Sequence, residues 1–172
     1  MESDSAPGVA VAGMTRERAF LEIAEAHLDA SYRLAAAILG DRGEAEDATQ
    51  DALVIAWRRW QQLRDPDRFE AWFHRILVNT CRDRLRRVAR RPTTDLSPEL
   101  AGASDPTSAV DDHDQIGRAM ALLSADHRIV VTLRYYLDLP IDQIAARLGV
   151  PAGTVNSRLH NALRQMRQGV DR

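Results

Sequence analysis

The chain has 172 residues and a formal net charge of −2, and 45% of its residues are hydrophobic. This length suits one ordinary domain or two small ones, and the hydrophobic content is enough for a globular core, which excludes a wholly disordered chain. The single cysteine, Cys81, excludes an internal disulfide and a multi-cysteine metal site. Helix-forming residues dominate and aromatic residues are few, so we expect an all-α fold.

The charges are distributed unevenly along the chain. Residues 67–91 carry eight arginines and three carboxylates, and residues 141–172 carry five arginines and two carboxylates. Residues 92–115, between them, carry six carboxylates and no arginine. This pattern indicates two separate basic surfaces. All 23 basic residues are arginine, which a GC-rich genome explains more simply than selection for binding phosphate.

Residues 1–14 are predicted to form a disordered tail. Glu2 and Asp4 stand where a signal peptide needs positive charge, and the apolar run that follows is too short for one. No segment reaches the roughly 20 apolar residues of a membrane span. We therefore expect a cytoplasmic protein without membrane insertion. Translation could begin at Met1 or at Met14.

Apolar residues recur at helical spacing over residues 20–39, and Gly40 is a plausible C-cap of that helix. A second helix should begin near Gly43 or Glu44, because carboxylates crowd its first turns and suit the positive end of a helix dipole.

A turn is expected at residues 62–68, where Pro66 interrupts the pattern, and a third helix should run over residues 67–88. Three helices with such short loops predict one compact unit over residues 15–91. Three aromatic side chains of the third helix have core spacing, which we favour over a role in stacking on bases: Phe69, Trp72 and Phe73.

Residues 92–114 contain three prolines and almost no apolar periodicity, which predicts a flexible acidic linker. A second helical unit is expected over residues 115–172. Its first short helix covers residues 116–123, and Ser124 is a candidate N-cap for the next helix.

Residues 141–159, "IDQIAARLGVPAGTVNSRL", have the spacing of a helix-turn-helix. Gly149 can end the first helix in the left-handed conformation, and Val150 can fill the corner. The second helix carries apolar residues on one side and polar residues on the other. Such a polar face suits DNA, with its first residues on base edges and its flanking arginines on phosphates, although most amphipathic helices simply expose it to water.

Three stretches together resemble regions 2 and 4 of the extracytoplasmic-function (ECF) sigma factors, which are bacterial transcription initiation subunits. They are "EAEDATQDALVIAWRRW", "FEAWFHRILVNTCRDRLRR" and "LRYYLDLPIDQIAARLGVPAGTVNSRL". The resemblance implies two small helical domains joined by the acidic linker: a region 2 bundle of three to four helices and a region 4 helix-turn-helix. It further implies an alternative sigma factor that binds core RNA polymerase and directs transcription from promoters with −10 and −35 elements.

In this family the second helix docks on the β′ clamp helices of the polymerase, and region 4 docks on the β flap. The residues that the resemblance assigns to core-polymerase binding are Asp47, Gln50, Asp51, Leu53 and Val54. Asp47 and Gln50 match the family's Asp-x-x-Gln pattern. Leu53 departs from it, because an aromatic residue is common there.

The resemblance also assigns two sets of DNA-binding residues. Those for the −10 element are Arg75, Asn79, Arg82, Arg86 and Arg87. Those for the −35 element are Thr154, Asn156, Ser157, Arg158, His160, Asn161 and Arg164. In the family the loop at residues 62–68 helps to receive a flipped base. Asn156 and Asn161 stand where basic residues are common, and since asparagine favours adenine they predict a different −35 preference.

Two other functions remain open from the sequence: a helix-turn-helix regulator that acts without polymerase, and an enzyme. The five histidines are scattered and no nucleophile motif or glycine loop is present, so we predict no catalytic residue, no metal and no cofactor. The resemblance implies an anti-sigma factor as a further partner. It also implies that the linker lies toward the RNA exit path, although composition alone fits a solvated tether equally well.

Overall fold

The computed structural model describes residues 8–90 and 108–170, and helix is the only regular secondary structure in that part of the chain. The helices are α1 (Gly8–Leu39), α2 (Arg42–Arg59), α3 (Phe69–Ala89), α4 (Ser108–Ala121), α5 (Ala125–Val131), α6 (Ile141–Leu148) and α7 (Ala152–Val170). Two single 3₁₀ turns, η1 (Trp60–Gln62) and η2 (Pro66–Arg68), join α2 to α3, and a π turn, η3 (Thr132–Tyr136), continues α5. The all-α prediction is confirmed.

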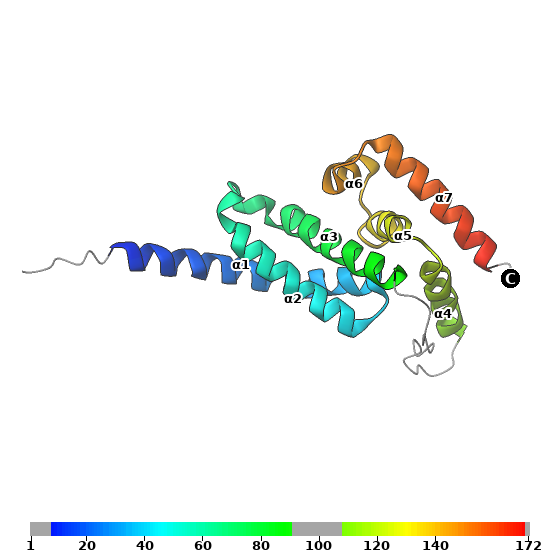
Figure 1. Ribbon diagram of the computed structural model, residues 1–172, viewed down its shortest axis with the longest axis horizontal. Helices are drawn as coiled ribbons and strands as arrows, with labels where there is room; N and C mark the ends of the chain where they lie inside the picture. Colours follow the sequence, from blue (N-terminus) through cyan, green and yellow to red (C-terminus); the bar gives the residue numbers. More distant parts are fainter. Residues whose placement is uncertain (1–7, 91–107, 171–172) are drawn as a thin grey trace, which may run out of the picture.

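Helices α1, α2 and α3 pack side by side as the first bundle, and α4 to α7 gather at one end of it (Figure 1). The N-terminal half of α1 extends beyond the bundle, away from α7 (Figure 1). Helix α5 lies beside the C-terminal half of α3, so the two predicted domains are in direct contact.

Two helices begin several residues earlier than the sequence predicts. Helix α1 starts at Gly8, inside the expected tail, because no proline interrupts residues 8–39 and a helix propagates cheaply once it has a nucleus. Helix α4 starts at Ser108, inside the expected linker. The rest of the tail and of the linker lies outside the described residues.

Polar caps set the other boundaries. The side chain of Asp41 accepts a hydrogen bond from the Glu44 amide at 2.7 Å, so α2 begins at Arg42, slightly before the expected start. Ser124 caps α5 as predicted, accepting a bond from the His127 amide at 3.3 Å. Gly40 has φ 73°, the left-handed conformation expected of a C-cap.

The helix-turn-helix is formed by α6 and α7. Gly149 follows α6 with φ 65° and ψ 36°, and the Val150 amide donates to the Ala145 carbonyl at 3.1 Å, which closes the turn. Ile144 of α6 and Val155 of α7 are fully buried. The predicted motif and its turn glycine are confirmed.

One continuous hydrophobic core joins both bundles, whereas the sequence allowed for two separate small cores. Leu34 and Ile38 of α1 and Leu77 of α3 belong to the same buried cluster as Ile129 and Leu133 of the second bundle. A smaller cluster lies between α5 and α7, built from Leu123, Val131 and Ala162. The second bundle therefore depends on the first for part of its core.

An aromatic cluster closes the end of the first bundle. The ring of Phe20 lies 5.2 Å from Trp57 and 5.4 Å from Trp60, and Phe69 stacks on Phe73 at 5.5 Å between centroids. Phe69 and Phe73 are buried, which confirms that they belong to the core.

Candidate functional site

A polar stripe runs along one side of α3. Arg75, Asn79, Arg82 and Arg86 follow one another at intervals of four, three and four residues, which places them on one helical face. The opposite side of the helix is buried, because Phe73 and its apolar neighbours enter the core. The stripe thus brings together four of the five predicted −10 residues. The fifth, Arg87, is exposed but lies off this face.

Within the stripe, Asn79 is already engaged. Its side-chain oxygen accepts a hydrogen bond from the Arg82 guanidinium at 3.0 Å. This bond orients the amide and leaves its nitrogen as the group free to donate.

Three arginines converge on the carboxylate of Asp126, in the first turn of α5. Arg82 Nε lies 3.0 Å from Asp126 Oδ1, and Arg86 Nη2 and Arg158 Nη2 lie 3.2 and 3.4 Å from Asp126 Oδ2. Two of these arginines belong to the predicted −10 surface and the third to the predicted −35 surface. One carboxylate therefore connects both basic surfaces.

The helix-turn-helix also packs against α3. An added Cβ at Gly149 would lie 3.2 Å from Arg75 Nη2, so this predicted −10 arginine sits over the turn. Next to it, Arg147 Nη1 lies 3.5 Å from Nδ1 of the buried His74, whose other close charge is Glu70 at 4.0 Å. Burial, and after it the charge of Arg147, lower the pKa of His74 to about 4. The ring is therefore neutral at pH 7.

Arg128 of α5 joins the bundles in another way. Its guanidinium donates to the carbonyls of Ile38 and Leu39, at 3.4 and 3.3 Å, and to that of Ala121 at 3.1 Å. The last carbonyls of a helix have no partner within it and lie at the negative end of its dipole. A positive side chain is therefore well placed at the ends of α1 and α4.

The predicted polymerase-binding residues lie on α2, and four of the five are exposed on one side: Asp47, Gln50, Asp51 and Val54. Leu53 is half-buried and packs against the core, so it does not share that exposed face. Trp57, which the prediction omitted, continues the face one turn further and is 42% exposed. Trp57 lies three residues after Val54, and this helical spacing could have predicted its place on the exposed face.

Arg84 links α3 to the acidic side of α2. Its guanidinium donates to Glu44 and to Asp51, each at 2.7 Å, and lies 3.8 Å from Asp47. Burial lowers the pKa of Arg84, but the bonds to Asp51 and Glu44 outweigh this and raise it. Two of the predicted polymerase-binding carboxylates are therefore held from within the chain.

The polar face of α7 matches its prediction in large part. Asn156, Ser157, His160 and Arg164 are exposed, while Val155 is buried on the other side. The remaining predicted residues, Thr154, Arg158 and Asn161, are partly buried. The Ser157 hydroxyl donates to the Gly153 carbonyl at 2.9 Å, and Arg164 donates to Asn161 at 3.4 Å.

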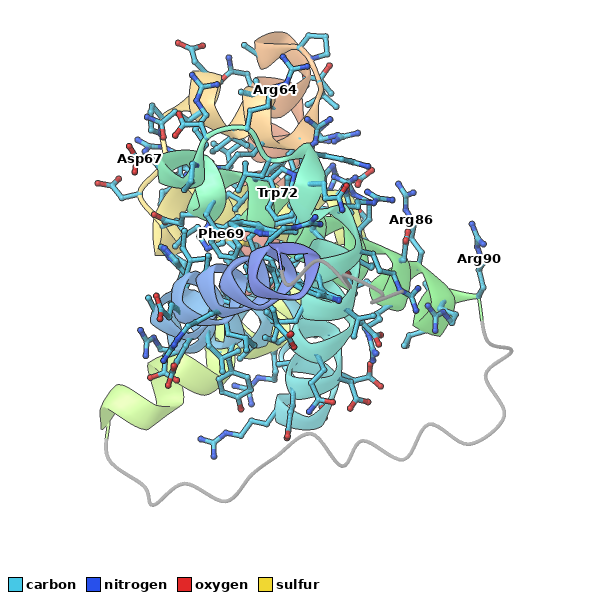
Figure 2. The ribbon with its side chains drawn as sticks, turned by 90° about the vertical axis from the view of Figure 1, so that its left-hand side faces the viewer. Arg64, Asp67, Phe69, Trp72, Arg86 and Arg90 are labelled. Carbon is cyan, nitrogen blue, oxygen red and sulfur yellow. The ribbon has the colours of Figure 1, made fainter. Side chains whose placement is uncertain are left out.

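Figure 2 shows the loop that precedes α3, with Arg64 above it, Asp67 at its left, and Trp72 and Phe69 below it toward α1. Arg64 and Asp67 are exposed. Asp65 organises this loop by accepting a hydrogen bond from the Asp67 amide at 3.1 Å. At the other end of α3, Arg86 and Arg90 project outward from the ribbon (Figure 2).

In the described part of the chain, no group of three His, Cys, Asp or Glu side chains is arranged to hold a metal ion. Burial raises the pKa of Cys81 to about 12, so this thiol is not a nucleophile at neutral pH. Among the described residues, no helix is long and apolar enough to cross a membrane.

The sequence pattern gave no indication of three residues that organise these surfaces: Asp126, Arg84 and Arg128. Each has at least one partner that lies 33 to 90 positions away in the chain. Asp126 follows the N-cap Ser124, and a carboxylate in the first turn of a helix is favoured by the helix dipole. This local explanation was sufficient, so nothing in the sequence indicated a distant partner.

Comparison with known proteins gives the family. Residues 23–91 match sigma-70 region 2, and residues 113–166 match sigma-70 region 4. The chain is 33% identical over 154 residues to the RNA polymerase sigma-E factor of Streptomyces antibioticus, covering 88% of this chain and 84% of that protein. It is 35% identical over 147 residues to the ECF RNA polymerase sigma factor SigL of Mycobacterium tuberculosis, covering 82% of each.

Two solved structures have a similar fold. The sigma factor RpoE of Bartonella quintana, in complex with the anti-sigma factor NepR, has a TM-score of 0.65 at 23% identity and covers 88% of this chain and 96% of its own. CnrH, in complex with the cytosolic domain of CnrY, has a TM-score of 0.63 at 25% identity, and the match covers 90% of this chain and 89% of CnrH. With both regions matched in order, this chain belongs to the ECF sigma factors of the sigma-70 family and is an alternative sigma factor that directs promoter-specific transcription.

Proposed function

We propose that this sigma factor performs its task with three faces, each on a different helix. The exposed side of α2 binds the β′ clamp helices of core polymerase, the stripe on α3 binds the −10 element, and the polar face of α7 binds the −35 element. The observation that carries this proposal is that each face is polar on the outside of a helix whose other side is in the common core.

The chemistry of α2 suits a protein partner. Asp47 and Asp51 supply charge, Gln50 supplies both a donor and an acceptor, and Val54 and Trp57 are exposed apolar side chains beside them. Mixed patches of this kind, with an aromatic residue, are typical of protein interfaces.

The chemistry of α3 suits single- or double-stranded DNA. Its arginines can neutralise phosphates, and the Asn79 amide can bond to a base edge. The buried positions of Phe69 and Phe73 leave few aromatic surfaces to trap unpaired bases. Opening of the promoter should therefore depend strongly on the DNA sequence.

On α7, Asn156 and Asn161 set the −35 preference. Asn156 is exposed near the start of the helix, where recognition helices contact bases, and an asparagine side chain pairs with two groups of adenine. Arg164, one turn beyond Asn161, is placed for a phosphate.

The polymerase supplies all the chemistry, and this chain has no catalytic residue of its own. It acts in the cytoplasm, where the DNA and the polymerase are. An anti-sigma factor is a further partner, because RpoE was solved with the anti-sigma factor NepR and CnrH with the cytosolic domain of CnrY.

Binding to core polymerase separates this function from that of a regulator acting on DNA alone. Charge reversal by Asp47→Arg should weaken binding of the chain to purified core polymerase about tenfold, as expected when a close charge pair at an interface becomes a repulsion. Affinity is measured by fluorescence anisotropy of the labelled chain.

Asp29→Arg is the matched control, because Asp29 is an exposed carboxylate on α1, outside all three faces. It should bind like the natural chain. If the natural chain did not bind core polymerase, or if both variants bound equally well, the assignment of α2 would be wrong.

A further inference from the structure

The carboxylate of Asp126 is the point at which the two DNA-binding surfaces meet. Its three partners, Arg82 and Arg86 of α3 and Arg158 of α7, lie at 3.0 to 3.4 Å and come from both bundles. Most of the cluster is shielded from water: the side chains of Arg82, Asp126 and Arg158 are 16%, 24% and 25% exposed, whereas that of Arg86 is 49% exposed. Ion pairs that are partly withdrawn from water are screened less by salt than pairs on the open surface.

Charge balance makes this carboxylate decisive. Three guanidinium groups surround one carboxylate, so without Asp126 three positive charges would face one another. Asp126 is also fixed in place, because Ser124 caps α5 and the first turn of a helix favours a negative side chain. The arrangement is that of an oxyanion held in an arginine cluster, which is how proteins hold a DNA phosphate.

We propose that Asp126 takes the place of a promoter phosphate and holds the free protein in a closed form, defined here as the arrangement with α5 and α7 against α3. This inference rests on the proposed function of α3 and α7. In the closed form Arg82, Arg86 and Arg158 are occupied, so DNA must displace Asp126 to reach them. DNA binds the open form better and shifts the population toward it.

The apolar contacts explain why the closed form persists without being permanent. Ile129 and Leu133 share a buried cluster with Leu34 and Ile38, and this contact favours closure on its own. Asp126 adds a charge-dependent contribution to it. A polyanion such as DNA can break the ion pairs of Asp126. The apolar contact between the bundles is broken when the polymerase binds the two domains at separate places.

The test measures the distance between the bundles in the free protein. Cysteines introduced by Arg58→Cys on α2 and Gln168→Cys on α7 are exposed positions for a donor and acceptor dye, and the buried Cys81 does not compete for the label. Energy transfer is recorded with no polymerase present. A fluorescein-labelled mixed-sequence duplex then gives the DNA affinity of the unlabelled chains.

Asp126→Asn should lower energy transfer and tighten duplex binding about fivefold, the value of one partly shielded ion pair. Asp138→Asn is the matched control: it makes the same change in charge at a side chain that is 96% exposed and pairs with the nearby Arg134 of η3, and asparagine tolerates its φ of 49°. It should leave energy transfer unchanged and strengthen duplex binding much less.

Equal energy transfer in the natural chain and in Asp126→Asn would overturn the proposal. If the circular dichroism of Asp126→Asn showed a loss of helix, Arg158→Gln would replace it, because it removes one ion pair of the cluster from α7. Unchanged energy transfer in Arg158→Gln would overturn the proposal equally. Because these measurements need no polymerase and no promoter, their failure is distinct from a failure of the proposed function.

Discussion

Single polar side chains determine how firmly the two bundles hold together. His74 is a clear case, since it is buried in α3 against Arg147 of α6 and its pKa is lowered from 6.5 to about 4. The unfolded chain therefore binds a proton to this ring more readily than the folded chain does. The neutral ring makes its full contribution to the free energy of unfolding above about pH 6.5, and this contribution is lost as the pH falls toward 4.

The free energy of unfolding should therefore decrease between pH 6.5 and 4, by up to about 3 kcal/mol from this histidine. His74→Gln should remove most of that slope while leaving the helices in place. Urea unfolding at a series of pH values measures it.

The control is His160→Gln, at an exposed position of α7, which should keep the slope of the natural chain. An identical slope in His74→Gln and in the natural chain would contradict the assignment of this pH dependence to His74.

At this scale the sequence predicted most of the side chains that lie outside on α7 and α3, because helical spacing alone separates Asn156 and Arg75 from buried neighbours. It did not predict which charges pair. Asp126 meets Arg82 and Arg86 over a separation of 40 residues or more, and such a pair follows from how two helices pack. Helical spacing carries no information about it.

At the scale of elements, the helix-turn-helix depends on one backbone conformation. Gly149 adopts φ 65°, and a side chain there would also approach Arg75 at 3.2 Å. Both effects act against any other residue, since L-residues are strained in this region.

Gly149→Ala should lower the free energy of unfolding by about 1–2 kcal/mol, the cost of a left-handed conformation for a residue with a Cβ. It should also weaken the contact between the turn and α3. Thermal unfolding followed by circular dichroism gives the change.

Gly153→Ala is the matched control within the same motif, because it lies in α7 with ordinary helical φ and open space around its Cβ. It should stabilise the chain by about 0.5–1 kcal/mol, since alanine is the better helix former. If both substitutions changed the free energy of unfolding in the same direction, the left-handed conformation of Gly149 would not be what restricts this position.

The elements themselves were predictable wherever a cap or a glycine marked the boundary. Ser124, Gly40 and Gly149 each act locally, so the sequence identified them. The starts of α1 and α4 were predicted too late, because the residues before the periodic stretches have modest helix propensity and contain no cap that marks a boundary. A helix that has already formed can extend through such residues.

At the scale of the molecule, the two sigma regions form a single packed body in the described residues. Ile129 and Leu133 look like ordinary core residues of the second bundle, and their spacing is the same whether they face their own bundle or another. The sequence therefore predicted two domains but not their contact. This contact covers Arg82 and Arg158, which we propose bind the two promoter elements.

We propose that α3 and α7 of this chain bind two DNA elements during initiation. Run-off transcription with purified core polymerase and a library of randomised upstream sequences is the most stringent test of this assignment. We predict enrichment of two conserved elements at a fixed spacing, and a changed upstream element, with the downstream one retained, when the selection is repeated with Asn156→Arg. Transcripts that show no sequence enrichment above core polymerase alone would contradict the account.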